Sequence, residues 1–268
     1  MNYLCRVAAA FVILMISVTP AWAEDDQAEL TRKSLNPVAD VISFPMQLNQ
    51  DHGIGPDDDL RRTWLNFQPV IPAELTKDTN VVIRTIVPIV KTESPESGGE
   101  AESGMGDILQ SFFISPIQPI NGWIMGFGPA FLYPSARKHD LGSQKWCAGP
   151  TGVMLRQEHG FTYGMLFNHI WSFAGNENRD NVSASFLQPF LGYTTGTFTT
   201  LLVNTESTYD WKNSQWTVPV NIMLNQMLKL PGGQPFSLQV GYRTYTETPD
   251  YGPDWGLRFS LTFLFPRK

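Results

Sequence analysis

The sequence predicts an all-β protein, a transmembrane antiparallel β-barrel of about twelve strands (range ten to fourteen) with a short N-terminal helical segment. Charged residues make up 16% of the chain, below the quarter usual in globular domains, while aromatic residues reach 12%. After residue 23 there is no apolar run long enough for a spanning helix. Segments of alternating polarity recur from residue 38 onward, as a barrel with a lipid-facing wall requires.

The first 23 residues have the layout of a secretory signal peptide. Arg6 supplies a positive charge, residues 8–18 are apolar, and Ala21-Trp22-Ala23 has small residues at both positions that signal peptidase reads. The apolar run is short for a membrane anchor, and acidic residues follow it. We therefore expect export through the inner membrane, cleavage after Ala23 and a location in the cell outer membrane.

The remaining chain divides into two parts. Residues 24–37 form a predicted periplasmic N-terminal segment with helix-forming composition, and a disordered tail is the alternative. Asn36 ends the helix, because a residue before proline avoids the helical region. Residues 38–268 form the predicted barrel. Its predicted strands are residues 39–50, 60–71, 80–91, 104–116, 121–134, 145–157, 160–174, 181–194, 197–209, 214–229, 235–247 and 254–266.

The residue pattern of the strands and the lengths of their connections both support a barrel over residues 38–268. Residues 161–167 alternate apolar and polar side chains, and the last strand alternates aromatic residues up to Phe265. The connections alternate between long and polar, as in 51–59 and 92–103, and tight, as in 158–159. Long loops outside and short periplasmic turns are typical of outer-membrane barrels.

Prolines inside the predicted strands conflict with regular ladders, since proline cannot donate a backbone hydrogen bond. We expect each of them to mark a bulge or a displaced strand end. They are Pro69, Pro88, Pro129, Pro150, Pro189 and Pro219.

Composition and motifs exclude several functions. A formal net charge of −6 argues against nucleic-acid binding. Cys147 is the single cysteine after the signal, which predicts no disulfide, and we expect no metal and no cofactor. The expected partners are outer-membrane lipid and lipopolysaccharide, the barrel-insertion machinery and a small-molecule solute of unknown identity. The Asp57-Asp58-Asp59 run is interpreted as a solvated loop.

The histidines predict no catalytic centre. Outer-membrane lipid hydrolases place a histidine two residues before a serine, so that base and nucleophile share one strand face. None of the four histidines has a serine at that spacing, and His169 and Ser172 face opposite sides of a strand. The expectation is therefore that the chain is not an enzyme, with no catalytic residues.

The inward faces of the strands supply the candidate lumen-lining residues. Arginines in a pore favour anions or polar solutes. In the alternative interpretation the arginines pair with inward acids such as Glu206 or Glu247 and simply fill a narrow interior. The candidates are Asn66, Gln68, Arg84, Asn221, Asn225, Gln239, Arg243 and Arg258.

Several motifs together resemble a known group. Asn66-Phe67-Gln68-Pro69, Gly126-Phe127-Gly128-Pro129, residues 168–175 and Gly252-Pro253-Asp254-Trp255 resemble Gram-negative proteins often labelled, misleadingly, "neuromedin U". That group is similar to outer-membrane barrels called the MetA-pathway of phenol degradation family. The resemblance implies an outer-membrane barrel with a transport role, and its name suggests aromatic compounds as solutes. It implies no catalytic or ligand residues.

Three functions follow as hypotheses. The first is a passive outer-membrane channel or transporter for small molecules. The second is a structural or surface-interaction outer-membrane barrel without transport, with the acidic loops as its working part. The third is a soluble secreted β-sandwich that binds a ligand.

Overall fold

The computed structural model describes residues 24–93 and 101–266. The expected signal peptide and its cleavage site lie outside the described residues. No helix in the described ranges is both long and apolar enough to cross a membrane.

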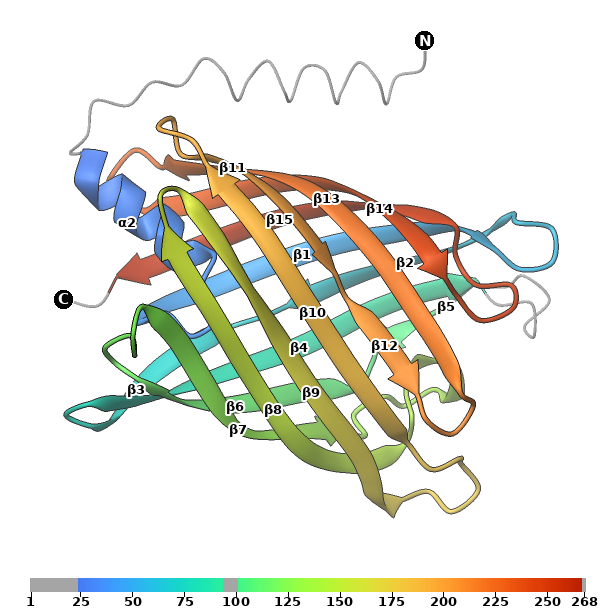
Figure 1. The fold of residues 1–268 in the computed structure, drawn as a ribbon. Helices are drawn as coiled ribbons and strands as arrows, with labels where there is room; N and C mark the ends of the chain where they lie inside the picture. The colour runs from blue at the N-terminus through green and yellow to red at the C-terminus, as the bar shows by residue number, and fades with distance from the viewer. Residues whose placement is uncertain (1–23, 94–100, 267–268) are drawn as a thin grey trace, which may run out of the picture.

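The chain forms one closed antiparallel β-barrel, which confirms the predicted fold class and excludes the β-sandwich (Figure 1). Helix α2 (Glu24–Ser34) precedes it, so the alternative of a disordered tail is wrong for this segment. The strands are β1 (Val41–Ile54), β2 (Leu60–Phe67), β3 (Val70–Thr76), β4 (Thr79–Glu93), β5 (Ala101–Met105), β6 (Ile108–Pro116), β7 (Trp123–Tyr133), β8 (Lys145–Glu158), β9 (Phe161–Gly175), β10 (Ser183–Thr194), β11 (Thr199–Thr205), β12 (Ser207–Asp210), β13 (Gln215–Lys229), β14 (Pro235–Glu247) and β15 (Trp255–Pro266).

These segments build twelve strands of the barrel, because three strands are interrupted. β2 and β3 are separated at Gln68 and Pro69, β5 and β6 at Gly106 and Asp107, and β11 and β12 at Glu206. β10 and β13 each pair with both β11 and β12, so these two segments occupy one position in the sheet. The ladder between β1 and β15 closes the barrel, from Val41 opposite Pro266 to His52 opposite Trp255.

The two ends of the barrel differ. We call the end that carries α2 the helix end, and its connections include the tight turns 77–78 and 159–160. The opposite end, the loop end, carries longer connections such as 134–144 and 248–254. Figure 1 shows α2 beside the C-terminal end of β15, while the longer loops gather at the far side. The predicted alternation of connection lengths holds over most of the described chain but fails at 211–214, which is no longer than the helix-end connections 195–198 and 230–234 on either side of it.

The outer face of the barrel is apolar. Phe44 and Leu48 on β1 and Phe259 on β15 are exposed, whereas Asn49, between outward neighbours, is buried. Outward aromatic rings contact each other toward both ends: Tyr242 stacks on Trp255 near the loop end, and Phe236 meets Phe263 near the helix end. An apolar band with aromatic rings at both edges is the surface that a bilayer requires.

The prolines interrupt the ladders as expected. Pro129 on β7 lies opposite Pro150 on β8, and pairing of each strand with its other neighbour lapses beside them. Gly149 precedes Pro150 and lies against the carbonyl group of His169, where a side chain has no room. Pro219 lies at a register shift between β13 and β14, and Pro69 at the break between β2 and β3.

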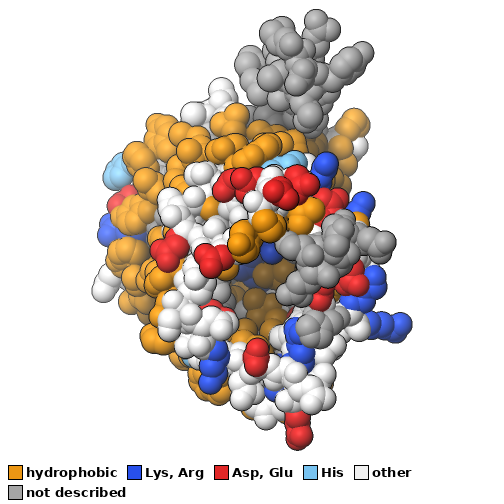
Figure 2. All heavy atoms as spheres, turned by 90° about the vertical axis from the view of Figure 1, so that its right-hand side faces the viewer, with side chains coloured by type: hydrophobic (Ala, Val, Ile, Leu, Met, Phe, Trp, Pro, Cys, Tyr) orange, Lys and Arg blue, Asp and Glu red, His pale blue; other side chains and the backbone are white. Residues whose placement is uncertain are grey.

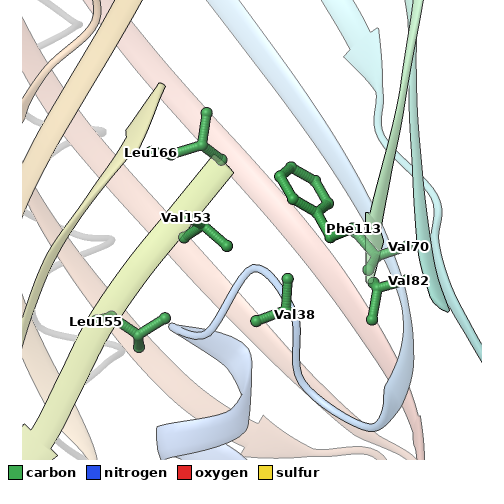
Figure 3. Packing of buried hydrophobic residues seen from close by; sticks show 7 residues of the cluster. All are labelled: Val38, Val70, Val82, Phe113, Val153, Leu155 and Leu166. Carbon is green, nitrogen blue, oxygen red and sulfur yellow. The ribbon is translucent and has the colours of Figure 1, made fainter. Parts of the chain in front are cut away.

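The N-terminal segment enters the helix end of the barrel. In α2, Thr31 is buried and the side-chain amide of Gln27 donates to the carbonyl of Met227, 3.1 Å away. Val38 follows the helix and packs inside the barrel against inward side chains of β4, β6 and β8 (Figure 3). This apolar cluster consists of Val38, Val70, Val82, Phe113, Val153, Leu155 and Leu166. It fills the lumen toward the helix end, where the removal of apolar side chains from water stabilises the barrel.

Candidate functional site

A cavity of about 440 Å³, which we call the main cavity, lies in the lumen. Residues from almost every strand of the barrel face it. Among the predicted candidates, those that line it are Asn66, Gln68, Arg84, Gln239 and Arg258. Figure 2 looks onto the loop end and shows a hollow near its middle, with acidic side chains gathered around it.

A second cavity of about 150 Å³ lies nearer the helix end. The predicted candidates Asn225 and Gln239 line it, opposite Leu35 and Pro37 of the N-terminal segment. The two cavities adjoin along β10, β11 and β14, because they share Gln188, Leu202, Asn204 and Gln239. The space inside the barrel therefore continues past the apolar cluster and meets the N-terminal segment.

The other two candidates lie within a buried network beside the main cavity. The Nε of Arg243 donates to the side-chain oxygen of Asn221 at 2.8 Å, and Asn221 donates to Asn204 at 2.8 Å. Arg243 is 4% exposed and Asn221 is 1% exposed. All eight candidates thus point inward, five onto the main cavity.

Glu206 is the acid that the arginines share. Its carboxylate accepts two hydrogen bonds from Arg258, at 2.8 and 2.7 Å, and one from Arg243 at 2.7 Å. Glu247, the other acid considered, is exposed at the end of β14, and its carboxylate forms no ion pair with any described residue. The interpretation of arginine pairing therefore holds for Arg243 and Arg258 through Glu206.

Glu206 lies at the break between β11 and β12 and faces the lumen. Thr205 and Ser207 flank it and their hydroxyl groups hydrogen-bond each other at 2.6 Å. The register of pairing with β10 and with β13 is the same on both sides of the break. Glu206 therefore keeps the alternation of the strand and faces the cavity together with Asn204 and Thr208.

Asp51 is a second buried acid, which the sequence did not single out. It accepts hydrogen bonds from Arg62 at 3.1 Å and from the hydroxyl of Tyr245 at 2.7 Å, and Arg243 lies 3.8 Å away. The ring of Trp64 lies beneath the guanidinium groups of Arg62 and Arg243, at 4.9 and 5.4 Å from its centre. Cation–π contacts of this kind fix the direction of an arginine.

Arg84 on β4 differs from the other arginines of the lumen. Its guanidinium donates to the side-chain oxygen of Gln68 at 2.9 Å. Within the described residues no carboxylate lies within ion-pair distance of it. A positive group of this kind faces the cavity with part of its hydrogen-bonding capacity free.

The connection 134–144, at the loop end, is held against the barrel by hydrogen bonds and by a buried side chain. Asp107, at the break between β5 and β6, accepts hydrogen bonds from the backbone amides of Ala136, at 3.1 Å, and Ser143, at 2.6 Å. Leu141, in a short 3-10 helix (His139–Leu141) that the sequence did not predict, is buried against Gly104. The connection is therefore tied down onto the barrel rather than extended into solvent.

One histidine has a serine partner that sequence spacing could not show. The Nδ1 of His169 on β9 lies 2.8 Å from the hydroxyl of Ser185 on β10, and Trp211 donates to the same hydroxyl at 2.9 Å. The two residues are directly opposite each other in the ladder and face outward. Neighbouring strands, rather than positions along one strand, bring them together.

The barrel, its apolar outer band and its polar lumen define the fold class of the outer-membrane β-barrels. No protein-family model matches the chain, and a search of curated proteins finds no match. Among solved structures, the chain is similar to an outer membrane channel from Pseudomonas putida F1, with a TM-score of 0.64, 13% identity, and coverage of 84% of this chain and 95% of the channel.

More distant similarity extends to two other barrels. Outer membrane phospholipase A from Escherichia coli has a TM-score of 0.47 and 10% identity, covering 91% of this chain and 98% of the phospholipase. A FadL homologue from Pseudomonas aeruginosa has a TM-score of 0.37 and 10% identity, with coverage of 86% and 92%.

The expectation that the chain is not an enzyme is corrected by this comparison. The solved barrels to which the chain is similar include a phospholipase as well as a channel. The argument from histidine spacing was also incomplete, because it considered only pairs along one strand, and His169 meets Ser185 across two strands.

Proposed function

We propose that the chain is an outer-membrane channel that lets small molecules cross passively. The observation that carries this proposal is the main lumen cavity, which is lined by polar side chains inside a closed barrel and adjoins a second cavity toward the helix end. A barrel whose only role was structural would gain stability from an apolar or fully paired interior. The similarity in fold to a channel agrees with the proposal.

In this proposal the chain is exported with a signal peptide cleaved after Ala23. The helix end faces the periplasm and the loop end faces outward, because outer-membrane barrels place short turns on the periplasmic side. The eight candidate residues line the route of the solute or hold its walls. The narrower resemblance to the "neuromedin U" and phenol-degradation groups belongs to the proposal as well, and with it aromatic compounds as solutes.

The N-terminal segment sets the narrow point of the proposed route. The apolar cluster around Val38 closes one side of the lumen at the helix end. The other side stays open as far as Leu35 and Pro37, which line the second cavity. A solute would pass between this segment and the wall formed by β10, β11 and β13 to β15.

Solute entry into proteoliposomes tests the proposal. Refolded protein is inserted into liposomes, and swelling is followed after dilution into isotonic solutions of small sugars and amino acids. The channel predicts swelling that falls as solute size rises, because the lumen is narrow. Folding is checked by heat-modifiable gel migration. A folded, inserted barrel that admits no solute would instead support the structural or surface-interaction barrel.

A further inference from the structure

The charges of the lumen leave one arginine without an acidic partner. Arg62, Arg243 and Arg258 each lie within 4.0 Å of Asp51 or Glu206. Arg84 has only the neutral Gln68 as a hydrogen-bond partner among the described residues. Four arginines therefore face two carboxylates, and the positive charge in excess is concentrated at Arg84, on the wall of the main cavity.

Two uncharged polar side chains of the cavity are also free of hydrogen bonds to the described residues. Ser111 is directly opposite Arg84 in the ladder between β4 and β6, is 6% exposed and lines the cavity. Asn168 on β9 is 8% exposed and lines it too. Neither side chain makes a hydrogen bond to any described residue. Buried polar groups are ordinarily hydrogen-bonded, so these two are suited to a bound molecule or water.

Part of the wall across the cavity is apolar, and we call this part the apolar wall; Asn168, Gln188 and Asn204 lie among its side chains. Its apolar side chains come from β9, β10 and β11, which lie on the far side of the barrel from β4. They are Leu166, Ile170, Phe186 and Leu202. A molecule that spans the cavity thus meets a cation and a hydroxyl at one end, and at the other end the apolar wall with polar side chains, including Glu206, beside it.

We infer that the main cavity is a binding site for small organic monocarboxylates with a compact apolar body. This inference rests on the proposed channel function and names its solute class. The carboxylate is held by the guanidinium of Arg84 and the hydroxyl of Ser111, and the body packs on the apolar wall. A volume of about 440 Å³ lies within the range of small-molecule sites.

The same residues discriminate against other solutes. An inorganic anion gains nothing from the apolar wall, and a neutral analogue leaves Arg84 without a charged partner. A second negative charge on the solute is disfavoured, because Glu206 faces the same cavity. Tight binding therefore requires a solute that has both an apolar body and a single negative charge.

Calorimetric titration of the folded barrel in detergent tests this inference with benzoate, its neutral counterpart benzamide, and acetate, which lacks an apolar body. We expect benzoate to bind most tightly. Arg84→Gln should weaken benzoate binding about tenfold or more, the cost of a lost charged hydrogen bond. The same change should alter benzamide binding far less, and Arg84→Lys should keep part of the affinity for benzoate.

Arg61→Gln is the matched control. Arg61 lies on β2 near the loop end, is largely exposed and does not line the cavity, so this change removes the same charge elsewhere. It should leave benzoate binding unchanged. Equal binding of benzoate and benzamide, or unchanged benzoate affinity in a folded Arg84→Gln variant, would overturn the inference. Because binding is measured without transport, a conducting barrel that does not bind benzoate refutes the site alone, and a binding barrel that admits no solute refutes the channel alone.

Discussion

Glu206 holds Arg258 with both oxygens of its carboxylate, at 2.8 and 2.7 Å, across the lumen of the barrel. Arg258 is 3% exposed and comes from β15, whereas Glu206 interrupts the strand formed by β11 and β12. Arg243 joins the same carboxylate, so one acid compensates two buried cations. Removing the acid leaves both charges in a poorly solvated place, which is costly.

Glu206→Gln should therefore lower the free energy of unfolding. Breaking a buried pair typically costs about 3–5 kcal/mol, and we expect about 2–3 kcal/mol because part of Glu206 reaches the cavity. Urea unfolding in lipid vesicles measures this loss. Glu247→Gln is the control, since Glu247 is exposed and should change stability by less than about 0.5 kcal/mol. Equal stability of the two variants would show that the arginines do not depend on Glu206.

The same charges should set ion selectivity. Glu206→Gln removes a negative charge from the cavity wall and should shift the reversal potential in a KCl gradient toward chloride. Arg84→Gln removes a positive charge from the same cavity and should shift it toward potassium. Shifts of the same sign, or none, would mean that ions do not pass this cavity.

The N-terminal segment should limit conductance. Val38→Asn places an amide in the apolar cluster, where it finds no hydrogen-bond partner and loosens the packing of the segment. We expect a larger single-channel conductance than in the unaltered protein. Lys33→Gln changes only the exposed pair with Glu29 and serves as control. Unchanged conductance in both variants would place the narrow point elsewhere.

The outer face should tolerate charge poorly. Leu48 lies near the middle of β1 and points outward, so Leu48→Arg puts a cation at the depth of the bilayer core. The expected loss is about 2–4 kcal/mol in lipid, from unfolding titrations. Leu48→Ala should cost less, because it introduces no charge. A Leu48→Arg variant as stable as Leu48→Ala would argue that this face does not contact lipid.

Most of the fold can be predicted from the alternation of polar and apolar residues along each segment. Period-two alternation and alternating connection lengths predict strands whose ends agree closely with those observed, as for residues 235–247 in β14. The faces of these strands follow from the same alternation, which is why the eight candidate residues all point inward. The barrel closes because β1 and β15 both keep regular alternation along their whole paired length.

The parts that pattern could not predict depend on irregularities and on pairing between strands. Alternation alone does not show whether Glu206 or Glu247 meets the arginines, because that depends on which strands lie across the lumen from one another. The contact of His169 with Ser185 needs the register of two strands. The place of Val38 in the lumen requires the tertiary path of the N-terminal segment, which has no periodic signal.

Single-channel recording from refolded protein in planar bilayers tests the central claim most directly. The proposed channel predicts discrete current steps in KCl, of small amplitude because the N-terminal segment narrows the lumen. Insertion of correctly folded protein without any current steps, in the unaltered chain and in Val38→Asn alike, would contradict it.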